Sequence, residues 1–269
     1  MLALTAALAF GGADFIGAVA SRKIGPIPVV LWMELAGLVV APVFLIAGKS
    51  SLSLPTMGLA ATSGVLGGIG LCLFYRAMST QAIGVAASLV GVVAAGWPVA
   101  WGLLGGEHPH PLQGAGLVLG LLAIAVIGSN SIGATSLAGV CLAIAAGCIL
   151  GTGFILLNAA SSGGAWTLVT TRLISFGILA PVALFTRSVR VPVGTVPLVV
   201  AVGVLDATGM AAFLLASRVG LLVVIVVLAS MYPAVTTLLA RIVTREHMRP
   251  SQTSGVLLAL GALALISTG

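Results

Sequence analysis

The chain has 269 residues, of which 60% are hydrophobic and only 6% are charged, and its mean hydropathy is +1.28. Soluble domains carry about 25% charged residues, so this composition excludes a protein with a water-facing surface. The net charge of +6 lies mostly in short loops, as is usual in membrane proteins, and gives no indication of nucleic-acid binding.

Apolar stretches follow one another along the chain, each close to the roughly 20 residues that cross a bilayer core. The first, residues 2–20, lacks the basic start of a signal peptide and has Asp14 in its middle, so we interpret it as a retained helix. Gly, Pro, Ser, Lys and Arg mark the helix ends. The predicted helices are 2–20, 29–47, 57–78, 84–104, 111–128, 136–156, 166–185, 196–217, 221–242 and 251–268. We therefore expect a multi-pass protein of the cell membrane, the inner membrane in a bacterium.

One loop sequence occurs twice. The string EHPHPLQGAG at 107–116 returns as EHMRPSQTSG at 246–255, displaced by 139 residues, about half of the chain. Further matches at this displacement are APV at 41–43 with 180–182, and Gly70, Phe74 and Ala77 with Gly209, Phe213 and Ala216. The chain therefore consists of two repeats, which we place at residues 1–130 and 131–269.

Each repeat holds five predicted helices, and five is an odd number. The second repeat must therefore begin on the opposite side of the membrane from the first. The predicted fold is an all-α integral membrane protein, with ten transmembrane helices as two inverted five-helix repeats around a central cavity. This plan is typical of secondary transporters, whose substrate site lies at the repeat interface.

Short motifs at matching places connect the chain to a known family. They are FGGADF at 10–15, FYRAM at 74–78, WP at 97–98, YP at 232–233 and the doubled E-H-x-x-P-x-Q-x-x-G turn. With these motifs the chain resembles the ten-helix EamA group of the drug/metabolite transporter superfamily. The resemblance implies export of amino acids or other small metabolites through a basket of helices. Many members begin the second helix with a basic residue, whereas this chain has Glu34 there and keeps Arg172 in the seventh.

Four ionisable residues fall inside predicted helices, where a charge costs about 2.5–3.5 kcal/mol near the bilayer centre. They are Asp14, Glu34, Arg172 and Asp206. The three acids are candidates to bind a cationic or amino group of the substrate, or to carry a proton as coupling ion. The alternative is internal neutralisation, with Arg172 paired to Glu34 or Asp206.

Aromatic residues and prolines complete the candidate site. Trp97 and Trp101 are four residues apart and share one helix face. Together with Tyr232 they are expected to form an aromatic wall for an apolar or cationic substrate; a membrane-interface belt or plain packing is the alternative. Pro98 and Pro233 each remove a helical hydrogen bond and are predicted to kink their helices.

The doubled loop carries further polar groups. Glu107 and Glu246 are expected to neutralise helix N-termini or to pin the loop. Glu107 with His108 and His110 does not amount to a predicted metal site, because two histidines in a short loop seldom bind a metal.

The function predicted from these features is secondary active transport of a small metabolite, such as an amino acid, outward by alternating access. An exporter of cationic drugs or quaternary amines is the alternative, favoured by the acids and the aromatic wall. An intramembrane enzyme is a remote alternative, because the chain has no H-E-x-x-H motif. We expect no cofactor and no nucleic-acid partner, and a monomer or weak oligomer in the bilayer.

Two arguments disagree on orientation. The side of the termini holds only Lys49 and Arg218, whereas the opposite side holds Arg22, Lys23, Arg76, Arg187, Arg190, Arg241, Arg245 and Arg249. Short basic loops stay in the cytoplasm, so this asymmetry predicts that both termini lie outside. The family resemblance implies that both are cytoplasmic. In either case, ten helices place the two termini on the same side.

Overall fold

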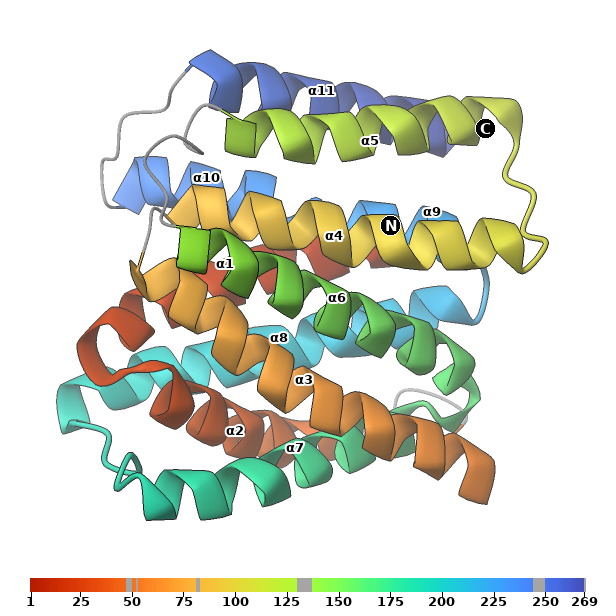
Figure 1. The fold of residues 1–269 in the computed structure, drawn as a ribbon. Helices are drawn as coiled ribbons and strands as arrows, with labels where there is room; N and C mark the ends of the chain where they lie inside the picture. Colours follow the sequence, from red (N-terminus) through yellow and green to blue (C-terminus); the bar gives the residue numbers. More distant parts are fainter. Residues whose placement is uncertain (47–49, 52, 81–82, 130–136, 244–249, 269) are drawn as a thin grey trace.

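The computed structural model describes residues 1–269 apart from 47–49, 52, 81–82, 130–136, 244–249 and 269. The described chain is a stack of α-helices without a β-strand (Figure 1). The helices are α1 (Leu2–Ile24), α2 (Pro26–Ile46), α3 (Leu54–Thr80), α4 (Ile83–Leu104), α5 (Pro111–Ser129), α6 (Leu137–Ala159), α7 (Ala165–Phe185), α8 (Val196–Ser217), α9 (Leu222–Ala229), α10 (Tyr232–Val243) and α11 (Pro250–Thr268). Two 3₁₀ turns, η2 (Ser161–Gly163) and η3 (Val193–Thr195), precede α7 and α8.

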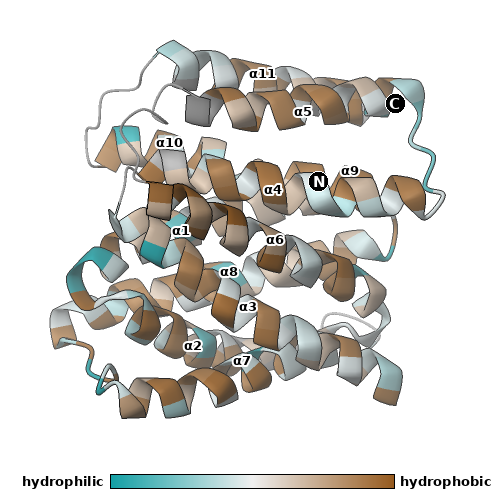
Figure 2. Ribbon diagram, viewed as in Figure 1, coloured by the Kyte–Doolittle hydropathy of each residue, from teal (hydrophilic) through white to brown (hydrophobic). Residues whose placement is uncertain are grey.

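The prediction of ten membrane helices is confirmed. Among the described residues, seven helical spans are long and apolar enough to cross a bilayer, and three shorter apolar helices accompany them. One of the seven, Leu222–Val243, comprises both α9 and α10. Hydrophobic residues cover the middles of the helices, and most hydrophilic residues lie at helix ends and loops (Figure 2). This distribution is the one that a bilayer requires.

The two halves of the chain pack reciprocally. Helix α3 packs on α6 as α8 packs on α1, and α3 packs on α7 as α8 packs on α2. The last helices of the two halves, α5 and α11, pack on each other and form the outer layer at the top of Figure 1. Exchanging α1–α5 for α6–α11 therefore reproduces the same set of neighbours, as expected for two repeats related by a two-fold axis.

Glycines allow the two central crossings to be close. A Cβ on Gly203 of α8 would lie 2.5 Å from the carbonyl oxygen of Met33 and 3.0 Å from the nitrogen of Gly37, both in α2. A Cβ on Gly64 of α3 would lie 2.6 Å from the carbonyl oxygen of Thr171 in α7. Only small residues permit backbones to approach in this way inside a membrane. The first crossing joins α2 to α8, and the second joins α3 to α7.

The two predicted kink prolines behave differently. The ninth membrane span breaks before Pro233: α9 ends at Ala229, and Met231 donates its N–H to the carbonyl of Leu228 in a 3₁₀ turn. In contrast, α4 remains helical through Pro98. Pro98 deprives the carbonyl of the residue four positions earlier of its helical donor. The same stretch of α4 packs closely on Gly151 of α6.

Candidate functional site

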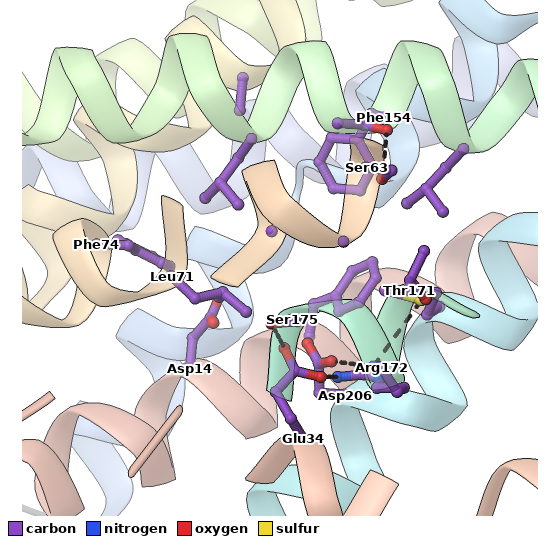
Figure 3. Close-up of a pocket in the computed structure, with 18 of the residues that line it drawn as sticks. Asp14, Glu34, Ser63, Leu71, Phe74, Phe154, Thr171, Arg172, Ser175 and Asp206 are labelled. Carbon is purple, nitrogen blue, oxygen red and sulfur yellow. Dashed lines mark hydrogen bonds and ion pairs between the residues drawn. The ribbon is translucent and has the colours of Figure 1, made fainter. Parts of the chain in front are cut away.

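A cavity lies where the two halves meet. Its lining comes from α1, α2, α3 and α4 of the first half and from α6, α7, α8 and α10 of the second. Counted as space for the centres of water molecules, it measures about 80 Å³, which is room for several waters or a small ligand. Most of the lining is apolar, and the charged residues lie together on one side (Figure 3). The expectation of a central cavity is therefore met.

Arg172 connects two carboxylates from different helices (Figure 3). Its Nη1 donates to Oε2 of Glu34 at 2.7 Å, and its Nη2 donates to Oδ2 of Asp206. Ser175, one turn further along α7, donates its hydroxyl to Oε1 of Glu34 at 2.8 Å. All three charged side chains are almost completely buried. Helices α2, α7 and α8 each contribute one charge, and the guanidinium of Arg172 lies beside Gly37 at the α2–α8 crossing.

The cluster answers one question that the sequence left open. Neutralisation of Glu34 or Asp206 by Arg172 was the alternative to a direct role in binding, and the structure shows that Arg172 pairs with both. Buried ion pairs remain inside a protein only when their charges are matched and hydrogen-bonded. Arg172 has therefore committed both terminal nitrogens to carboxylates, and it is poorly placed to bind an anion in the cavity.

Asp14 lies in the same cavity without such a partner. It is 5% exposed, it lines the cavity from the middle of α1, and no described residue forms a hydrogen bond or ion pair with its carboxyl group. Figure 3 shows it pointing toward the cavity, apart from Arg172. Three acids thus share the cavity with one guanidinium. A cation or a proton at Asp14 would neutralise this carboxylate and reduce the excess of negative charge.

Two pairs of aromatic rings also lie at the cavity. Phe74 packs against Tyr232, with ring centroids 6.1 Å apart, and Phe154 packs against Phe10, also at 6.1 Å. All four residues line the cavity. Tyr232 was predicted to do so. The phenylalanines were not singled out as site residues, although Phe10 and Phe74 lie in the motifs FGGADF and FYRAM, and Phe74 recurs as Phe213.

The expected position of the two tryptophans was wrong. Trp97 is 48% exposed and Trp101 is 54% exposed, and neither lines the cavity. Helix α4 instead turns small residues inward, with Ala94 at the cavity and Pro98 against Gly151. A bulky indole on that face would keep α4 away from α6. The two indoles share an outer face, in agreement with the alternative of a membrane-interface or packing role.

Comparison with known sequences identifies the family. The sequence profile of the EamA-like transporter family matches residues 1–129 and again residues 137–268, one match for each repeat. The chain belongs to the EamA-like transporter family. The resemblance noted from the sequence motifs is thereby confirmed. A multi-pass membrane protein of a transporter family is consistent with the hydropathy and the helix pattern.

The fold of this EamA-like transporter is also found among solved structures. One, described only as "Crystal structure of protein", superimposes with a TM-score of 0.78 over 99% of this chain and 95% of that chain. Its sequence identity is 18%, so the likeness concerns the fold alone. No curated protein matches the chain significantly.

On the side of the termini, polar contacts connect the loops of the EamA-like transporter. Arg218, at the end of α8, donates from Nε to the carbonyl of Ser161 at 2.8 Å and from Nη2 to that of Ser162 at 3.2 Å. Ser51, from the α2–α3 connection, donates its hydroxyl to the same Ser162 carbonyl at 2.9 Å. Three loops are thus joined at one end of the bundle.

Glu107 adds a fourth loop to this side. Its carboxylate accepts the backbone N–H groups of Leu222 at 3.1 Å and Val223 at 3.0 Å. These are the first two residues of α9, so the loop carboxylate satisfies free donors at a helix N-terminus, as expected from the sequence. The corresponding Glu246 lies outside the described residues. Within the described chain, no group of three or more His, Cys, Asp or Glu residues could hold a metal.

Proposed function

We propose that this protein is a secondary active transporter for a small metabolite that carries an amino or other cationic group, with the central cavity as its binding site. The observation that carries the proposal is the buried, unpartnered carboxyl group of Asp14 in a cavity whose guanidinium is already occupied. An isolated charge inside a membrane protein is costly, and such residues commonly mark substrate or ion pathways.

The charges of the cavity favour an ammonium group over a carboxylate as the part of the substrate that is recognised. Glu34 and Asp206 hold Arg172, and the hydroxyl of Ser175 is donated to Glu34. The hydroxyl of Thr171 is donated to the backbone of its own helix, one turn earlier. These contacts occupy both terminal nitrogens of Arg172 and the two hydroxyls, and they leave Nε of Arg172 without a partner among the described residues. Asp14 offers an acceptor, and the aromatic rings beside it attract cations.

Asp14 would also supply the coupling to protons. A carboxyl group in this site can be neutralised either by a proton or by a substrate cation, but not by both together. Release of the substrate on one side would therefore favour uptake of a proton, and the proton would leave before the next substrate binds. Such competition at one group is sufficient for exchange of protons against substrate by alternating access.

Outward transport across a bacterial inner membrane remains part of the proposal, on the strength of the family resemblance. In the described conformation the loops on the side of the termini are joined through Arg218 and Glu107. Opening to that side would require these contacts to break. We propose that they are among the contacts that alternate during the cycle.

A proteoliposome assay tests the proposal. Purified protein is reconstituted with a proton gradient, and primary amines, quaternary amines and zwitterionic amino acids of similar size are compared as substrates. We expect gradient-driven movement of amines. Asp14→Asn should abolish that movement, and Asp14→Glu, which restores the charge, should retain part of it. Equal transport by the wild type and the Asn variant would refute the role of Asp14, and absence of gradient-driven transport for every compound would refute secondary transport of this class.

A second candidate, export of quaternary amines, is favoured by the four aromatic side chains at the cavity. Quaternary amines cannot donate a hydrogen bond but bind well to aromatic rings. The same assay separates the two candidates: preference for quaternary over primary amines, together with a large loss on Phe74→Leu, would favour the second.

A further inference from the structure

A second hollow lies on the outside of the protein, away from the central cavity. It is a groove of about 440 Å³ between α2 and α8. One wall is a single face of α2 from Trp32 to Val39, and the other is the first turns of α8 from Val196 to Val200. Every lining residue is apolar. Val39 is 74% exposed and Val200 is 46% exposed, so the groove opens to the hydrocarbon region that surrounds these helices.

The groove has a structural cause. Helices α2 and α8 approach each other most closely at Gly37 and Gly203, where backbone touches backbone. Beyond that crossing, toward the start of α8, the side chains on the two helices leave a gap. The α7–α8 loop closes the gap at its end, because Trp32 Nε1 donates to the carbonyl of Val189 at 2.8 Å and Val191 lines the groove.

The closed end of the groove is basic. The loop that Trp32 holds contains Arg187 and Arg190, both exposed, and no acidic residue occurs between Arg187 and Asp206. The indole of Trp32, 36% exposed and with its N–H bonded to a loop carbonyl, is a side chain of the membrane–water interface. An apolar groove thus ends at a loop that carries two arginines.

We propose that this groove is a binding site for an anionic phospholipid, with one acyl chain between α2 and α8 and the phosphate at Arg187 and Arg190. The apolar walls match a hydrocarbon chain, and the two arginines match an anionic headgroup. A second copy of the chain fits less well. In a symmetric dimer the same surface faces itself, so the arginines of the two copies would be brought toward one another.

The site has a consequence for the protein as a whole, and it does not depend on the proposed substrate. Helix α2 belongs to the first repeat and α8 to the second. They carry Glu34 and Asp206, the two carboxylates that hold Arg172. A lipid in the groove would contact both halves of the protein just outside this ion cluster. Anionic lipid should therefore raise the stability of the described conformation.

Native mass spectrometry in detergent, with a thermal melt on the same samples, tests the site. The probes are phosphatidylglycerol and phosphatidylcholine with identical acyl chains. We expect the wild type to retain phosphatidylglycerol preferentially and to melt at a higher temperature with it. The double variant R187Q/R190Q should lose this preference, with phosphatidylglycerol bound roughly tenfold or more weakly, since each basic residue near a membrane surface contributes about 1 kcal/mol to attraction of anionic lipid.

Two further variants separate the parts of the site. Val200→Trp fills the groove from an exposed position and should weaken retention of both lipids. R76Q/R241Q removes the same charge from α3 and α10, which do not border the groove, and should leave the preference intact. An unchanged preference in R187Q/R190Q, an equal loss in R76Q/R241Q, or a lipid-free dimer that Val200→Trp dissociates would each overturn the proposal.

Discussion

Replacing Arg172 by methionine removes the cation that Glu34 and Asp206 share and leaves a side chain of similar length. The Glu34 pair is 2.7 Å long, so at an effective dielectric constant of about 20 its attraction is about 6 kcal/mol. Desolvation of the charges offsets most of this attraction. What remains in the variant are two buried carboxylates without a partner, and breaking a buried pair in this way costs about 3–5 kcal/mol.

A second variant tests whether the lost stability comes from the unpaired carboxylates. In the triple variant Glu34→Gln, Arg172→Met and Asp206→Asn, no unpaired charge is left, and the new side-chain amide on α2 can still accept a hydrogen bond from Ser175. Because buried ionic clusters often exchange for neutral groups at little cost, the triple variant should recover at least half of the lost stability. Equilibrium unfolding in mixed micelles measures both differences. If Arg172→Met were within about 1 kcal/mol of the wild type, the cluster would not hold the three helices together as inferred.

Four further predictions each concern a single residue. Glu107→Ala leaves two N–H groups at the start of α9 without their acceptor and should cost about 1–2 kcal/mol, seen as faster amide exchange at Leu222 and Val223; unchanged exchange would contradict this. Gly203→Ala places a Cβ 2.5 Å from the carbonyl oxygen of Met33 and should destabilise the fold by about 1–3 kcal/mol in the same micelles, more than Gly177→Ala, which meets no neighbouring atom. Phe213→Ala empties a fully buried site 4.9 Å from the ring of Phe154 and should cost about 3–5 kcal/mol; a loss below about 1 kcal/mol would show that this packing matters little. Arg187 has a φ of 54°, so Arg187→Gly should raise the melting temperature in lipid-free detergent by relieving about 1 kcal/mol of backbone strain, and a lower melting temperature would argue against strain there.

Hydropathy and the internal repeat were sufficient to predict the fold. Helix number follows from the length of apolar runs, because a bilayer fixes how many residues each crossing needs. The break before Pro233 was also predictable, since proline cannot donate the helical bond. The continuous helix at Pro98 was not, because a local signal does not show whether a neighbouring helix supports the backbone. Here α4 packs closely on α6 at Gly151.

The site was predictable in its charges and less so in its aromatic residues. Buried charges inside helices are rare and costly, so Asp14, Glu34, Arg172 and Asp206 stood out one by one. Their pairing depends on which helices cross, which no spacing in the sequence reveals. The sequence correctly predicted that Trp97 and Trp101 share one helix face. It did not correctly predict the direction in which that face points. The inward face of a helix in a membrane is set by its small residues rather than its large ones.

The acids of the cavity do not obey the symmetry of the scaffold that holds them. A shift by the repeat length of 139 residues carries Asp14 onto Gly153 and Asp206 onto Gly67, and both glycines also line the cavity. The positions that correspond to Asp14 and Asp206 in the other half therefore carry no side chain. The cavity therefore has acidic side chains at one set of positions and glycines at the corresponding set. A ligand with a cationic group is expected to bind there in one orientation. The inward-open and outward-open forms, although built from matching helices, would then differ in free energy when loaded.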